Sequence, residues 1–200
     1  MEEQRKKKTD DRNIIYIPLG SSCSLAYQLD KYNLRKESYP FDWILSRDKE
    51  IINILKDEFR NFLDIEYLQA KNKSSNFPII DEFWNDNKND KDNIIRVYHK
   101  LYKITFVHDF KNFDELEMNS AKIKYDRRIK RFLEHMRDPN IKKIVIHIGN
   151  TFNHQIFDEL FKTLNYTNYE IKFLSHKEIG YTSDWKMDEF DWKHYFSTIK

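Results

Sequence analysis

The chain has 200 residues, of which 40% are hydrophobic and 34% are charged, and its formal net charge is only +2. This length and hydrophobic content suit a single domain with a buried core. The balance of interspersed charges argues against nucleic acid or a membrane surface as a partner.

The single cysteine excludes an intramolecular disulfide framework. No apolar run approaches the roughly 20 residues that cross a bilayer, and no signal peptide precedes the first apolar segment. We therefore expect a cytoplasmic protein in a reducing compartment.

The N-terminal third of the chain opens with a polar stretch. Residues 1–12 predict a disordered tail, and residues 13–200 predict one catalytic-like domain. The continuous apolar run Ile14–Leu19 indicates a buried strand. The turn Gly20-Ser21-Ser22 then leads into a helix that is expected to run to about Lys31.

The middle of the chain predicts an amphipathic helix over Lys49–Phe62, followed by a polar insertion near residues 70–93. The second half alternates strand, helix, strand, helix, strand over Lys103–Val107, Lys122–Arg137, Lys142–Ile148, Asn153–Leu164 and Tyr169–Leu174. Alternation of this kind implies parallel strands with crossover helices. We predict an α/β fold with a central, mostly parallel sheet and helices on both faces; a papain-like α+β layout is the alternative.

Three residues with reactive or polar side chains each follow a predicted strand: Cys23, His108 and Asn150. In parallel sheets, functional residues gather at the carboxyl ends of the strands. If the strands are parallel, these three residues should therefore meet at one edge of the sheet.

Cys23 falls in the first turn of a predicted helix. Unpaired N–H groups and the helix dipole favour a thiolate at that position. The backbone N–H groups of Gly20, Ser21, Ser22 and Cys23 could also form an oxyanion hole. The alternative is a buried cysteine that acts as a small hydrophobic residue.

His108 is the best candidate for a general base. A cysteine nucleophile needs an imidazole within hydrogen-bond reach, and the imidazole needs a third group to orient it. Asp109, Asn150 and Asp42 are candidates for that role. Because adjacent side chains of a strand point to opposite faces, Asp109 can orient His108 only if the strand has already ended. The alternative is a surface His-Asp pair.

Two other functions stay open. The spacing Asp-x-x-His at Asp191–His194, with Gly20-Ser21 and Gly149-Asn150, loosely matches the sequence blocks of SGNH-type hydrolases, in which Ser21 or Ser22 would attack. The chain could instead be a non-catalytic interaction domain, with an aromatic surface formed by Tyr39, Phe41, Trp43, Phe83 and Trp84. We expect neither a metal nor a cofactor, since the sequence shows no zinc spacing and no phosphate-binding glycine motif.

Several blocks of the sequence resemble those of one domain family. They are Leu19–Cys23 with Ala26 and Leu29, Leu34-Arg35, Phe41-Asp42-Trp43, Val107–Phe110, Arg127–Leu133 and Ile144–Gly149 with Thr151. The sequence resembles the putative papain-like cysteine peptidases of bacteria and large DNA viruses, over about residues 14–155. This resemblance implies Cys23 as the nucleophile and His108 as the base.

The leading hypothesis is therefore a cysteine-dependent hydrolase that acts on an amide or ester bond of a peptide or acyl substrate. Cys23 attacks and His108 carries the proton, while Asp109 or Asn150 orients the imidazole. Gly20, Ser21, Ser22, Asp42 and Trp43 are the candidates for oxyanion or substrate binding.

Overall fold

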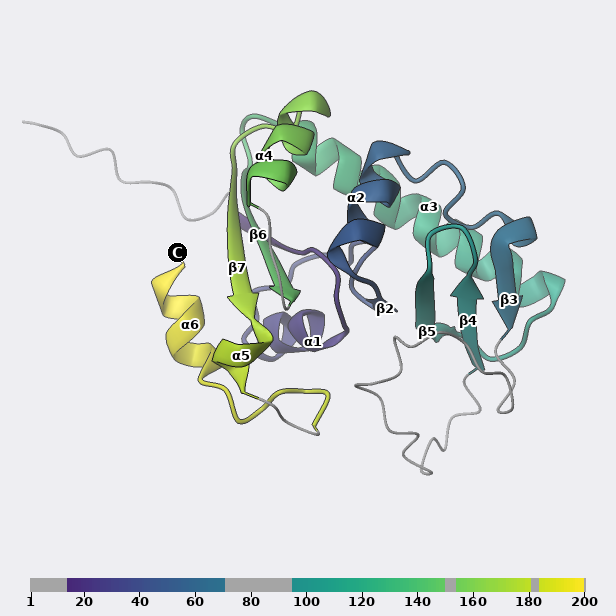
Figure 1. The fold of residues 1–200 in the computed structure, drawn as a ribbon, viewed down its shortest axis with the longest axis horizontal. Helices are drawn as coiled ribbons and strands as arrows, with labels where there is room; N and C mark the ends of the chain where they lie inside the picture. The colour runs from purple at the N-terminus through teal and green to yellow at the C-terminus, as the bar shows by residue number, and fades with distance from the viewer. Residues whose placement is uncertain (1–13, 71–94, 150–153, 181–183, 200) are drawn as a thin grey trace, which may run out of the picture.

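A computed structural model describes residues 14–70, 95–149, 154–180 and 184–199. Two sheets lie side by side, one parallel and one antiparallel, with helices packed around them (Figure 1). The predicted α/β fold class is confirmed. The predicted tail at 1–12 and nearly all of the predicted insertion near 70–93 lie outside the described residues.

The parallel sheet has the strand order β1-β6-β7. Its strands are β1 (Ile14–Pro18), β6 (Lys142–Gly149) and β7 (Tyr169–Ser175). All three strands were expected from the sequence, and both pairings are parallel.

Both faces of this sheet are covered by helices, and the central strand β6 is accordingly buried without interruption from Lys143 to Gly149. One face packs against α1 (Ser24–Lys31) and α6 (Trp192–Thr198), as the shared cluster of Ile144, Ile146, Leu25 and Trp192 shows. The other face packs against α4 (His154–Thr163). The arrowheads of β6 and β7 point toward α1, so α1 begins at the carboxyl edge of the sheet (Figure 1).

The antiparallel sheet has the order β2-β5-β4-β3. Its strands are β2 (Ile44–Leu45), β3 (Leu68–Ala70), β4 (Ile95–His99) and β5 (Ile104–Phe110). The strand expected at Lys103–Val107 is β5, but it lies here rather than in the parallel sheet. The reason is local, because a tight turn in which the Lys103 N–H donates to the His99 carbonyl (2.7 Å) folds β5 back on β4 as a hairpin.

Local backbone and capping interactions explain where the two longer helices between the sheets begin and end. α3 (Glu115–Arg137) starts earlier than expected, because Asp114 accepts a hydrogen bond from the Glu117 N–H (2.9 Å). α2 (Asp48–Lys56) ends before the predicted Phe62, because Glu58 and Phe59 adopt positive φ angles of 47° and 63°. Two shorter helices, η2 (Ile65–Tyr67) and α5 (His176–Ile179), complete the described elements, which include no helix long and apolar enough to cross a membrane.

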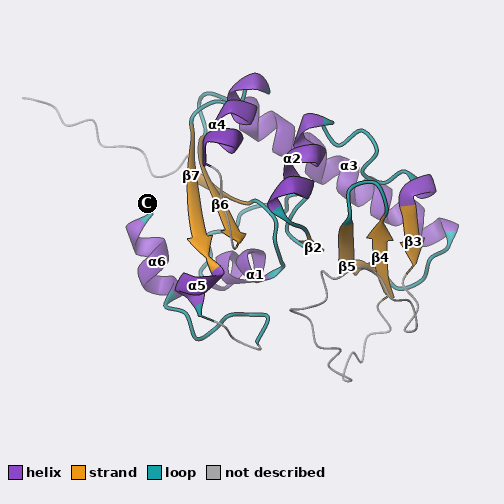
Figure 2. Ribbon diagram, in the orientation of Figure 1, coloured by secondary structure: helices purple, strands orange, loops and turns teal. Residues whose placement is uncertain are grey.

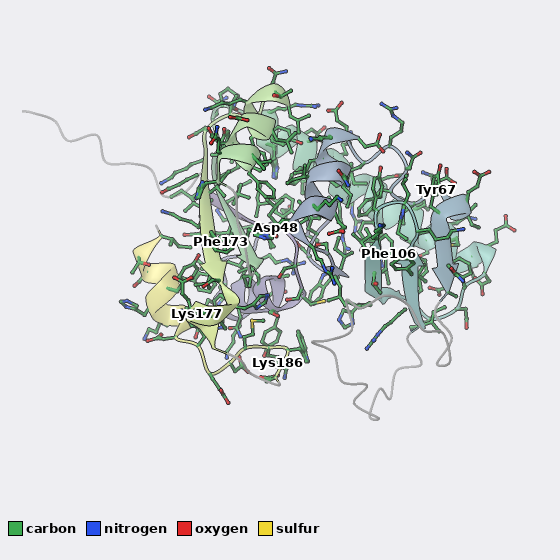
Figure 3. The ribbon with its side chains drawn as sticks, in the orientation of Figure 1. Asp48, Tyr67, Phe106, Phe173, Lys177 and Lys186 are labelled. Atoms are coloured by element: carbon green, nitrogen blue, oxygen red, sulfur yellow. The ribbon has the colours of Figure 1, made fainter. Side chains whose placement is uncertain are left out.

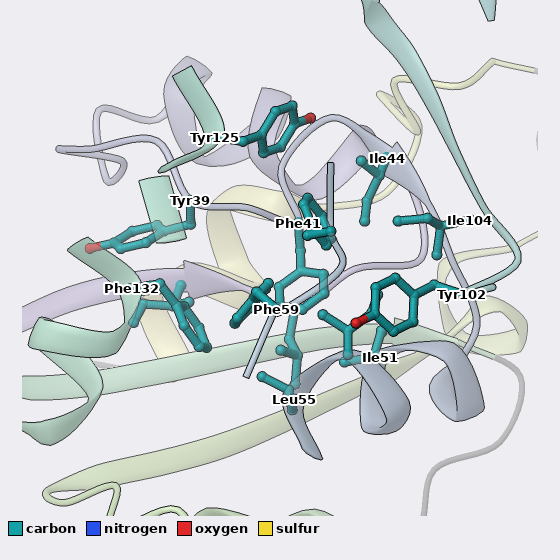
Figure 4. Close-up of a cluster of buried hydrophobic side chains, with 14 of the residues drawn as sticks. Tyr39, Phe41, Ile44, Ile51, Leu55, Phe59, Tyr102, Ile104, Tyr125 and Phe132 are labelled. Atoms are coloured by element: carbon teal, nitrogen blue, oxygen red, sulfur yellow. The ribbon is translucent and has the colours of Figure 1, made fainter. Parts of the chain in front are cut away.

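An aromatic core joins the two sheets. α2 and α3 lie across the space between the parallel and antiparallel strands (Figure 2). Their side chains meet aromatic rings from the loops, with Phe41, Phe59 and Phe132 packed at centroid distances of 5.5–6.0 Å (Figure 4). The segment between β1 and α2 is therefore held by both sheets, and it is this segment that carries Cys23 and Asp42.

Candidate active site

The turn between β1 and α1 has an unusual backbone. Gly20 and Ser21 both adopt left-handed conformations, with φ angles of 69° and 71°. A Cβ atom at Gly20 would lie 2.6 Å from Ser46 Oγ, so only glycine fits. The Ser21 N–H donates to Ser46 Oγ (3.2 Å), and the Ser46 N–H donates back to the Ser21 carbonyl (3.3 Å). These contacts tie the turn to the loop between β2 and α2.

Cys23 is the N-cap residue of α1, and its own side chain does not cap the helix. The Ser24 N–H in the first turn donates instead to Ser22 Oγ (3.4 Å). The thiol is fully buried against Leu45 and Val107, and Trp43 and Trp185 pack against this cluster. Burial raises the pKa of the thiol well above its usual value, and the Asp109 carboxylate adds to the rise. The resting form is therefore the neutral thiol rather than a thiolate.

His108 is exposed on β5, at a β-bulge. Val97 of β4 pairs with Phe106 while Ile95 pairs with Phe110, so β5 carries extra residues between the two pairs. The His108 ring packs edge-on against Trp43 (centroids 5.5 Å apart) and lies 6.5 Å from the Trp185 ring. The same two tryptophans thus contact both the Cys23 cluster and the imidazole.

The Asp109 carboxylate pairs with side chains of α3 rather than with the His108 imidazole. β5 continues through Phe110, and Asp109 is buried whereas His108 is exposed. Its carboxylate accepts a hydrogen bond from the Tyr125 hydroxyl (2.6 Å) and pairs with Lys124 (2.7 Å). The condition for orienting His108, a strand that has ended, is therefore not met.

Asp42 is the most deeply buried carboxylate near the thiol, and none of its surface is exposed. One of its oxygens, Oδ2, accepts from Arg35 Nε (3.0 Å), Arg35 Nη2 (2.7 Å) and the Tyr39 N–H (3.0 Å). Burial raises its pKa to about 6, although the charge of Arg35 opposes the rise. The guanidinium of Arg35 also lies over the Trp43 ring, 5.5 Å from its centroid.

Sequence reasoning missed Arg128. It is buried on the apolar face of α3, among Tyr125 and Phe132. Its Nη1 lies 3.8 Å from Asp109 Oδ1, and its guanidinium carbon lies 5.0 Å from the centre of the Tyr125 ring. The signal was available, because helical spacing places position 128 on the same face as the apolar residues three before and four after it.

His147 and Asp48 form a second polar pair at this edge of the parallel sheet. His147 is fully buried in β6 and donates from Nδ1 to the Leu19 carbonyl (2.6 Å). Its Nε2 lies 2.8 Å from Asp48 Oδ1 at the start of α2. Asp48 lies between Phe173 of the parallel sheet and Phe106 of the antiparallel sheet in the view of Figure 3. The pair thus fastens α2 to the end of β1.

The serine and histidine candidates for a serine hydrolase make hydrogen bonds with other residues. The Ser22 hydroxyl shares a hydrogen bond with Ser24 Oγ (2.7 Å). Asp191 caps α6 by accepting from the His194 N–H (2.9 Å), and His194 is exposed. None of the hydrogen bonds among the described residues joins His194 to Ser21 or Ser22.

Some candidates cannot be placed, since Asn150, Phe83 and Trp84 lie outside the described residues. Within the part of the chain that is described, no group of three or more His, Cys, Asp or Glu side chains could hold a metal ion.

Comparison with known proteins gives two matches. A family described as putative papain-like cysteine peptidases matches residues 14–177. Uncharacterized protein R408 of Acanthamoeba polyphaga mimivirus is 36% identical over 124 residues, which are 59% of this chain and 54% of that protein. The chain thus spans a little over half the length of this viral relative. No solved structure matches.

Proposed function

The chain belongs to the family of putative papain-like cysteine peptidases, and on that premise we propose that it is a cysteine-dependent hydrolase of an amide or ester bond. Cys23 is the nucleophile and His108 the general base. One observation carries the proposal: Trp43 and Trp185 pack against both the Cys23 cluster and the His108 ring. Two residues that lie far apart in the sequence thereby share one neighbourhood.

The chemistry follows from the neutral thiol. His108 removes the S–H proton as the sulfur attacks the carbonyl carbon of the substrate. Backbone N–H groups at the start of α1, where the Cys23 side chain makes no capping hydrogen bond, stabilise the oxyanion that forms. The leaving amine or alcohol then takes the proton from His108, and a water molecule hydrolyses the thioester and restores the thiol.

The surroundings of Cys23 favour this order of events over a stable thiolate-imidazolium pair. Burial and the Asp109 carboxylate both hold the thiol pKa high. Proton removal is therefore expected to accompany attack rather than precede it. Trp43 and Trp185, which are partly buried and pack against the thiol cluster, would contact a substrate that reaches Cys23.

The test uses p-nitrophenyl acetate as the ester and a panel of peptidyl aminomethylcoumarins as the amides. Cys23→Ala should abolish turnover, and His108→Gln should lower kcat by about 10²–10⁴-fold, the usual contribution of a general base. His194→Ala is the matched control, because His194 is an exposed histidine on α6. Full turnover in Cys23→Ala would refute the proposal, and its loss in His194→Ala would favour a serine hydrolase instead.

A further inference from the structure

We propose that Arg128 is an anion-binding residue of the Cys23 site, and that the substrate carries a carboxylate next to an amide N–H. This inference rests on the proposed function, since it names the class of molecule that the site would bind. It starts from polar atoms that are buried without a hydrogen-bond partner.

The first observation is the state of the Arg128 guanidinium. Its Nε and Nη1 atoms are both buried, and neither donates a hydrogen bond. The residue as a whole is 7% exposed. Buried guanidinium groups normally donate to carboxylates, phosphates or carbonyls, because an unmade hydrogen bond in a dry site is costly. These donors therefore lack the acceptor that their burial calls for.

The second observation is how the charges pair around Arg128. Asp42 is matched by Arg35, and Asp109 is matched by Lys124 at 2.7 Å. The other Asp109 oxygen accepts from Tyr125. Arg128 approaches Asp109 only to 3.8 Å. Among these buried groups, Arg128 is thus the cation without a carboxylate of its own, and an anionic group would complete the set.

The third observation is the free oxygen of Asp42. Oδ2 accepts all three hydrogen bonds made to this carboxylate, whereas Oδ1 is buried and accepts none. This part of α3 packs along the segment that leads to Asp42, since Arg131 donates to the Ser38 carbonyl (3.0 Å) and the Phe132 and Phe41 rings lie 6.0 Å apart, and the charge of Arg128 acts to lower the pKa of Asp42. A ligand that satisfies both must bring an acceptor for Arg128 and a donor for Asp42 Oδ1.

A carboxylate with an amide N–H on the adjacent carbon meets both requirements in one small group. The C-terminal residue of a peptide and an N-acyl amino acid share this chemistry. The nearby thiol, whose pKa both Asp42 and Asp109 raise, would then face the acyl group joined to that N–H. The site is thereby expected to select substrates by the carboxylate beside the bond that is cleaved.

The experiment measures binding in the Cys23→Ala protein, so that no turnover is needed. The probe is N-acetylglycine, and its uncharged counterpart is N-acetylglycinamide. Binding is read from the indole N–H resonance of Trp43, which is assigned with a Trp43→Phe variant. N-acetylglycine should bind, and N-acetylglycinamide should bind at least about 10-fold more weakly, as expected for loss of a charge-assisted hydrogen bond.

Matched variants of α3 isolate the contribution of Arg128. Arg128→Met should weaken N-acetylglycine binding by about 10- to 100-fold, while Arg127→Met, at the exposed neighbouring position, should leave it unchanged. If Arg128→Met does not fold, Arg128→Lys and Arg127→Lys give the same comparison, because lysine keeps the charge but loses the planar fork.

The outcomes separate this inference from the proposed function. No binding of N-acetylglycine, equal binding of the amide, or equal binding by the Arg128 and Arg127 variants would each overturn the inference. Turnover that depends on Cys23 would then still support the hydrolase. Conversely, binding that depends on Arg128 in a protein whose turnover does not require Cys23 would support the anion site and refute the hydrolase.

Discussion

Two buried polar neighbourhoods lie close to the end of β1, and they differ in how completely their atoms are paired. Around His147, both ring nitrogens have partners, the Leu19 carbonyl and Asp48. Around Cys23, Asp42 Oδ1 and two nitrogens of Arg128 are buried without a hydrogen bond. The first arrangement is complete as a structural connection. The second leaves these atoms unpaired, and on our proposal a bound anion with an amide N–H pairs with them.

The comparison predicts that the His147 neighbourhood contributes most to stability. His147→Ala leaves a cavity and removes the partner of the Leu19 carbonyl, so it should lower the free energy of unfolding by about 3–5 kcal/mol. Urea denaturation measures this loss. The matched His194→Ala, at an exposed position on α6, should stay within about 0.5 kcal/mol of the wild type. Equal effects of the two substitutions would contradict the assignment of His147 as a structural connection.

In the Cys23 neighbourhood, the buried carboxyl group of Asp42 should instead make the free energy of unfolding depend on pH. Burial raises the pKa of Asp42 from 3.8 to about 6, so the folded protein holds a proton that the unfolded chain releases. The contribution of Asp42 to stability should therefore be greatest below pH 4, fall as the pH rises toward 6, and level off above it. The loss is about 3 kcal/mol at 1.36 kcal/mol per pKa unit.

Asp42→Asn isolates that titration. The variant should lack the fall in unfolding free energy between pH 4 and pH 6, whereas Asp126→Asn, at an exposed position on α3, should keep it. Guanidinium denaturation at several pH values gives both curves. A wild-type curve parallel to that of Asp42→Asn would show that the carboxylate of Asp42 stays ionised in the folded protein across this range.

The parallel sheet was predictable because its signals are local. β1 and β6 contain continuous apolar runs, β7 alternates apolar and charged residues, and the crossover helices keep a 3.6-residue period. The antiparallel sheet was harder to predict. β2 has only two residues, and β3 has three, which is too short for a periodicity. β5 was expected, but the hairpin with β4 that decides its sheet depends on a turn at Lys103 with a positive φ angle and no glycine.

The residues of the candidate site also differ in whether local sequence or tertiary structure determines their role. Cys23 was found from its position after a strand and before a helix, which is a local pattern. The path of Asp109 toward α3 was not predicted, because it depends on where β5 ends and on the tertiary position of Lys124 and Tyr125. Arg128 was overlooked because a basic residue in a charged helix is usually exposed.

A glycine comparison tests how tightly the Cys23 turn is packed. Gly20 and Gly180 both have positive φ angles, of 69° and 87°. A Cβ atom at Gly20 would meet Ser46 and Ile51, whereas one at Gly180 would meet nothing within 4 Å. Gly20→Ala should therefore destabilise the fold by about 2–3 kcal/mol and Gly180→Ala by about 1 kcal/mol. Equal losses of melting temperature in the two variants would mean that backbone strain alone matters at both positions.

The smallest expected effect on stability comes from substitution of Trp185, which is only partly buried. The same substitution tests whether this ring shields the Cys23 thiol from solvent. Trp185→Ala should cost about 1 kcal/mol or less, yet it should speed alkylation of Cys23 by iodoacetamide, because this ring packs against the thiol cluster. Lys186→Met removes the cation that lies 6.0 Å from the centre of the Trp185 ring but keeps the ring itself, so it should leave the rate near that of the wild type. In both proteins the rate should keep rising with pH through the neutral range, since the thiol pKa is raised and only the thiolate reacts. An alkylation rate that levels off near neutral pH would instead show that the resting protein already holds a thiolate. Proton removal would then precede attack, and Cys23 and His108 would form an ion pair before the substrate binds.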